Sequence, residues 1–71
     1  MAKTWKECYK IANDLKNEVE RLNIHVLEES LNFPSSGDGV TTRMHIARVN
    51  VKLAEATELL ESVTEECHKR V

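Results

Sequence analysis

The sequence has few residues that break helices or crosslink chains, and no excess of positive charge. Its 71 residues include one proline, two glycines and two cysteines, and the formal net charge is -2. A chain without surplus positive charge binds a phosphate backbone poorly, so we expect no nucleic acid polymer as a partner. No apolar run approaches the roughly 20 residues that span a bilayer, and the start from Met1 to Thr4 is not hydrophobic. We therefore expect a cytoplasmic protein without a membrane partner.

Two cysteines and three histidines are too few for a disulfide framework or an evident metal site. A metal ion needs three or four converging ligands, so we predict no metal and no cofactor. Thiols in a chain without a secretion signal are usually reduced. Cys8 and Cys67 are either small apolar core residues or, if the chain folds back on itself, partners that could be bridged. Both alternatives remain open at this point.

The only proline and both glycines fall within residues 32–39, which makes this segment the predicted turn. We place a helix at about 5–31, the turn at about 32–40 and a second helix at about 41–69. Thr4 and Glu7 have the spacing of a capping box at the start of the first helix. Apolar residues recur at alternating steps of three and four and form one stripe on each helix. The stripes are Trp5, Cys8, Ala12, Leu15, Val19, Leu22 and Val26, and then Ile46, Val49, Leu53, Ala56, Leu60, Val63 and Cys67.

These patterns predict an all-α fold, an antiparallel two-helix hairpin that forms a single domain. Each helix is basic early and acidic late, so folding back at the turn sets opposite charges beside each other. A chain of this length buries only a thin core by itself. We therefore expect the hairpin to assemble with copies of itself into a helical bundle oligomer, a dimer or a higher assembly.

A second group of apolar residues lies near the turn, on the side of each helix away from its stripe. A monomer would leave this group in water, and a large exposed apolar patch commonly marks an interface. We assign self-association to it. The alternative is that Phe33 and the turn cover the group within one chain. The group comprises Ile24, Leu27 and Leu31 of the first helix and Val40, Met44, Ala47, Val51 and Ala54 of the second.

No arrangement of residues predicts catalysis. His25 and His45 both lie near the turn with carboxylates in the same region, and such groups can transfer protons. They fall on the flanks of the stripes rather than at one point, and no nucleophile lies near them. Ser35 and Ser36 lack the motif of a nucleophile elbow. We predict no catalytic residue and no enzymatic activity.

The start of the second helix is a candidate ligand site. A helix N-terminus presents unpaired amides and a partial positive charge, and hydroxyl and basic side chains surround this one, as an anion site requires. In the alternative, Thr41 or Asp38 only caps the helix, and Glu28 or Glu29 pairs with the arginines. The candidate ligand residues are Thr41, Thr42, Arg43, His45 and Arg48.

Residues 43–56 carry an arginine near the helix start, a small residue about a turn later and the pattern Lys52-Leu53-x-Glu55-Ala56. This segment resembles the second helix of the hairpin in phage proteins that sequester the cyclic-nucleotide signals of bacterial immunity. A tryptophan that often follows in that family is absent, with Leu59 and Leu60 nearby instead. The resemblance implies a helical oligomer that binds a phosphorylated nucleotide between subunits without cleaving it.

Two hypotheses of function follow. The first is a small non-enzymatic oligomeric interaction protein or regulator that acts by binding a partner protein. The alternative is a sponge that sequesters a phosphorylated, cyclic nucleotide at a subunit interface, which would make a small phosphorylated ligand its partner.

Overall fold

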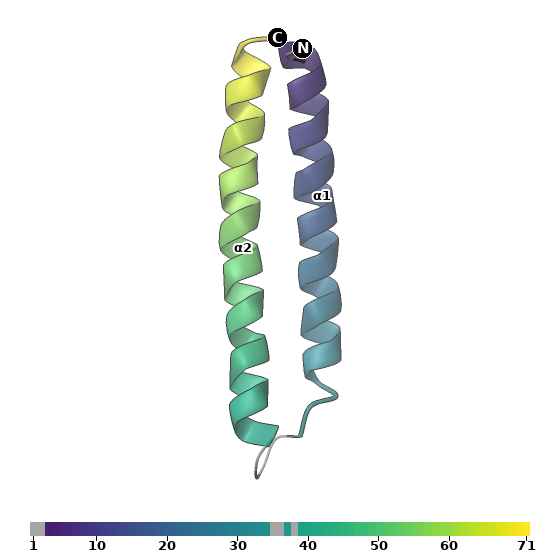
Figure 1. Ribbon diagram of the computed structural model, residues 1–71, viewed down its shortest axis with the longest axis vertical. Coiled ribbons are helices and arrows are strands. Elements are labelled where there is room, and N and C mark those ends of the chain that lie inside the picture. Colours follow the sequence, from purple (N-terminus) through teal and green to yellow (C-terminus); the bar gives the residue numbers. More distant parts are fainter. Residues whose placement is uncertain (1–2, 35–36, 38) are drawn as a thin grey trace.

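The computed structural model describes residues 3–34, 37 and 39–71. It contains two helices that pack against each other, α1 (Trp5–Ser30) and α2 (Gly39–Lys69). The helices run antiparallel, so that both chain termini lie at one end of the molecule (Figure 1). The principal-axis extents are 52 × 19 × 14 Å. The predicted all-α helical hairpin is confirmed.

Local signals in the sequence set the ends of the helices. The Thr4 hydroxyl oxygen accepts a hydrogen bond from the backbone amide of Glu7 at 3.2 Å, which caps α1. The Glu7 carboxylate lies 4.0 Å from the Lys3 ammonium. At the far end the backbone amide of Leu31 donates to the carbonyl oxygens of Glu28 and Glu29.

In the turn, Gly37 has a φ of 63°, a left-handed conformation that favours glycine. The amide of Val40 donates to the carbonyl oxygen of Gly37 at 3.3 Å. The second helix begins at Gly39 rather than at 41. Ser35, Ser36 and the possible cap Asp38 lie outside the described residues.

Two rows of side chains on each helix lie between the helices, and every member is buried or half-buried. Members of a row are seven residues apart, as in a coiled coil. We call the first the inner apolar row: Ala12, Val19 and Val26 of α1, and Ile46, Leu53, Leu60 and Cys67 of α2.

The second row between the helices is polar, and we call it the inner polar row. Across it, the Asn50 side-chain amide donates to the side-chain oxygen of Asn23 at 2.6 Å and to its backbone oxygen at 2.9 Å. The hydroxyls of Thr57 and Thr64 donate to carbonyl oxygens of their own helix. Asn23, Asn50, Thr57 and Thr64 therefore have hydrogen-bond partners within the hairpin. The row consists of Lys16, Asn23 and Ser30 of α1, and Arg43, Asn50, Thr57 and Thr64 of α2.

In a simple antiparallel hairpin the whole apolar stripe of each helix is expected to face the other helix, and this polar row shows that here it does not. Only the inner apolar row faces the other helix. The remaining members of the stripes, apart from Trp5, form an outer apolar row, and Leu15, Leu22, Val49 and Val63 are each more than 40% exposed. Trp5 is half exposed as well, at 50%. The outer apolar row consists of Cys8, Leu15 and Leu22 of α1, and Val49, Ala56 and Val63 of α2.

Candidate functional site

The main surface feature of the hairpin is its exposed apolar area. Among the described residues, only Ala12 and Cys67 are buried apolar residues, whereas 14 large apolar side chains are exposed. Ionic contacts are few by comparison. The two ion pairs found among the described residues, Lys3–Glu7 and Lys52–Glu55, are both exposed pairs within local sequence.

The apolar group near the turn is exposed, as the sequence indicated. We call it the turn-end patch. Phe33 is half-buried, yet Leu31 beside it remains 68% exposed and Met44 64% exposed. Phe33 therefore leaves most of the patch in water. The patch consists of Ile24, Leu27 and Leu31 of α1, and Val40, Met44, Ala47, Val51 and Ala54 of α2.

At the opposite end, two aromatic contacts join the helices. The rings of Tyr9 and His68 lie 5.3 Å apart, tilted by 41°. The Arg70 guanidinium lies 4.9 Å from the centre of the Trp5 ring, within the range of a cation–π contact. Sequence reasoning missed both contacts, although the positions of these residues near the chain ends could have suggested them.

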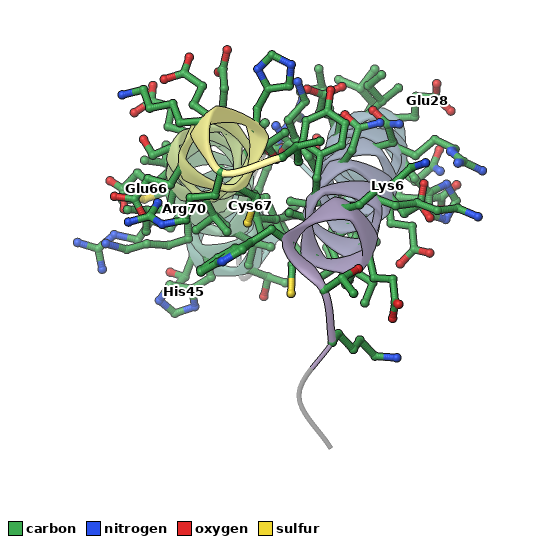
Figure 2. All side chains as sticks on the ribbon, turned by 90° about the horizontal axis from the view of Figure 1, so that it is seen from above. Lys6, Glu28, His45, Glu66, Cys67 and Arg70 are labelled. Carbon is green, nitrogen blue, oxygen red and sulfur yellow. The ribbon has the colours of Figure 1, made fainter. Side chains whose placement is uncertain are left out.

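The two cysteines lie near these contacts. Cys67 is buried and lies between the helices (Figure 2). Cys8 is half-buried, and both thiols are free. A shallow pocket of about 250 Å³ opens at the Tyr9–His68 contact and is lined by these two residues together with Thr64, Glu65 and Lys69. This pocket contains neither cysteine.

The five predicted ligand residues do not converge on one point. Thr41, His45 and Arg48 follow steps of four and three, which place them on one side of α2. All three are exposed, and His45 points outward in Figure 2. Arg43 is half-buried in the inner polar row, and Thr42 lies on a third side of the helix. A ligand that touches all five would have to reach around α2.

The alternative partners of the arginines are placed differently from the expectation. Glu29 accepts a hydrogen bond from the side chain of Asn32 at 3.2 Å. Glu28 points away from the second helix (Figure 2). Within residues 3–34, 37 and 39–71, neither glutamate forms an ion pair with Arg43 or Arg48.

Other classes of site were sought in the described part of the chain. Residues 3–34, 37 and 39–71 contain no group of three or more histidine, cysteine, aspartate and glutamate residues placed to hold a metal ion. Over the same residues, neither helix has an apolar stretch that could cross a bilayer. His25 and His45 are both exposed, on different helices. The apolar surfaces are therefore the strongest candidate functional feature.

Comparison of the chain with protein-family models, curated proteins and solved structures gave no significant match.

Proposed function

We propose that this chain is a self-assembling helical interaction protein, which completes its core with further copies and acts by binding a partner protein. The single observation that supports this is the imbalance of burial: 14 large apolar side chains are exposed and only Ala12 and Cys67 are buried among the apolar residues described. Large apolar patches are uncommon on monomeric soluble domains and mark interaction surfaces.

The dimensions of the hairpin give the same indication. Its radius of gyration is 16.3 Å, whereas a compact domain of 71 residues has about 11 Å. Its accessible surface is 5687 Å², against about 4,500 Å² for a compact monomer of this mass. The excess, about 1,200 Å², exceeds the roughly 800 Å² that each partner buries in an ordinary protein interface.

Ten of the 14 exposed large apolar residues lie in two separate regions of the surface, four in the outer apolar row and six in the turn-end patch. Self-assembly through one region leaves the other accessible. A small protein with two apolar surfaces can thus hold itself together with one and bind a different protein with the other. This division supports an interaction role beyond self-assembly.

The test is the mass of the free protein, measured by light scattering or sedimentation at micromolar concentration. We expect at least two chains per particle. Because the association is apolar, the mass should persist in about 1 M salt, where exposed ion pairs are screened. A particle of one chain under both conditions contradicts the proposal, and a mass that falls to one chain only in high salt indicates association through charge instead.

A further inference from the structure

The apolar surface of each helix is not centred on the contact with the other helix. Successive residues of a helix are about 100° apart, so rows offset by three or four positions lie about 50° apart around the axis. On each helix the inner polar row lies on one flank of the inner apolar row, and the outer apolar row lies on the other. The apolar surface of each helix is therefore centred to one side of the hairpin.

Both helices turn their apolar rows to the same side. Trp5 continues the spacing of the inner apolar row, and Arg70 continues that of the outer apolar row. The contact between them joins the helices across this side. The other side of the hairpin has a groove. Its lining includes Asn23 and Thr57 of the inner polar row and Ile24 and Ala54 of the turn-end patch. We call the side made by the inner and outer apolar rows of both helices the broad apolar face.

We infer that a second copy of this chain packs on the broad apolar face, so that two hairpins form a four-helix bundle. The inference rests on the proposed function and specifies its surface and its partner. The face extends along most of the hairpin, from Trp5 to Val26 on α1 and from Ile46 to Cys67 on α2. A second hairpin matches that length. It would bury the exposed Leu15, Leu22, Val49 and Val63 and leave the inner polar row and the turn-end patch outside the new core. Self-association would then use the broad apolar face instead of the turn-end patch, to which the sequence pattern assigned it.

Residues at the edge of the face specify how the two copies are oriented. The edge of α1 carries Ile11 and then Glu18, and the edge of α2 carries Leu59 and then Lys52, each three residues after a member of the outer apolar row. Because Asn23 lies opposite Asn50, Ile11 and Leu59 lie at about the same height along the hairpin, within about one turn. Glu18 and Lys52 are matched in the same way.

A two-fold axis parallel to the helices sets α1 of one copy beside α2 of the other. Ile11 then meets Leu59 of the second copy, and Glu18 meets Lys52 of the second copy, so apolar and oppositely charged side chains are paired on both edges. A two-fold axis across the helices would set α1 beside α1, and Glu18 would approach its own equivalent. For these four residues only the first arrangement is complementary. In the single hairpin Lys52 lies 3.5 Å from Glu55, an exposed pair that does not hold it firmly.

Two matched variants test which face binds the second copy. Leu15→Glu places a charge on the broad apolar face, and Val51→Glu places the same charge on the turn-end patch at a similarly exposed site (44% and 56%). We expect sedimentation to show one chain for Leu15→Glu, or at least about a tenfold weaker association, and an unchanged mass for Val51→Glu. The opposite pattern, or two unchanged masses, overturns the inference. A wild type that is already a single chain contradicts the proposed function itself.

A mixing experiment tests the orientation and does not depend on Leu15→Glu remaining folded. Glu18→Lys alone and Lys52→Glu alone each place like charges at both edges, and each should weaken association by roughly tenfold at low salt. An equimolar mixture pairs Lys at 18 with Glu at 52 between unlike chains, so it should recover the wild-type affinity. A mixture as weak as its two components overturns the orientation, as does a variant whose affinity equals that of the wild type.

Discussion

At the scale of single residues, the Asn23–Asn50 pair is the only hydrogen bond between side chains of α1 and α2 among the described residues. Asn50→Ala removes two hydrogen bonds and leaves the Asn23 side-chain oxygen without its donor. We expect the free energy of unfolding, measured by urea denaturation at fixed protein concentration, to fall by about 1–2 kcal/mol. Asn17→Ala is the control on exposed helix surface and should change it by under about 0.5 kcal/mol. Equal effects would mean that the pair does not stabilise the hairpin.

The two cysteines differ in burial, and this predicts different reactivity. Cys67 is 6% exposed between the helices, whereas Cys8 is half-buried at the outer apolar row. In a single hairpin an alkylating reagent should modify Cys8 faster than Cys67, because a buried thiol reacts only when the structure opens. In the assembled protein the inferred second copy covers Cys8 as well, so both thiols should react slowly. Mass spectrometry of samples taken over time measures both rates, and urea should make them similar. Rapid native modification of Cys67 would contradict its placement between the helices.

At the scale of the elements, the start of α2 allows the nucleotide hypothesis to be tested directly. If a phosphorylated ligand binds there through Arg43, Arg43→Ala should weaken it by about 1.5–3 kcal/mol, the contribution of a charged hydrogen bond. A panel of mono-, di- and cyclic nucleotides should then raise the melting temperature of the wild type and raise that of the variant less. No effect of any nucleotide on the wild type would remove the sponge hypothesis and leave the interaction hypothesis standing.

The two elements themselves could be predicted from local patterns. The Thr4 cap, the breakers of the turn and the steps of three and four indicate two helices, because each signal acts within a few residues along the chain. The rotation of the helices could not be obtained in this way. An apolar stripe shows which side of a helix avoids water, but it does not show whether that side meets its own hairpin or another molecule.

The inner polar row determines how each helix is rotated about its axis. Its position between the helices depends on contacts between residues that are distant in the sequence. Asn23 and Asn50 can lie between the helices because they satisfy each other, and Thr57 and Thr64 because they donate to their own helix. In the sequence they are simply polar residues and therefore predict exposure. Because each helix is rotated so that its inner polar row lies between the helices, the outer apolar row is exposed. This exposed row is part of the strongest candidate surface. The turn-end patch was identifiable earlier because it lies away from every stripe.

At the scale of the whole molecule, a hairpin with so little buried apolar area has the construction of half a bundle. The two helices contact each other only along the inner rows, and the broad apolar face remains exposed to solvent in the single hairpin. If a second copy packs there, as proposed, folding and association should occur together, since that copy would supply most of the apolar contacts that stabilise each helix. This coupling distinguishes an obligate assembly from a stable monomer that dimerises afterwards.

Coupled folding and association predict a melting temperature that depends on protein concentration. For a dimer, each tenfold increase in concentration stabilises the folded state by about 1.4 kcal/mol, by mass action. With an unfolding entropy of about 2.1 cal/mol/K per residue over two chains, that corresponds to a rise of about 4–5 °C per tenfold. Circular dichroism melts over about a hundredfold range of concentration measure it. Leu15→Glu, if it abolishes pairing, should be largely unfolded or melt far lower, in either case without this dependence, whereas Val51→Glu should retain it. A wild-type melting temperature that stays constant across the range would show that the hairpin folds alone, and the open broad apolar face would then require an explanation other than self-assembly.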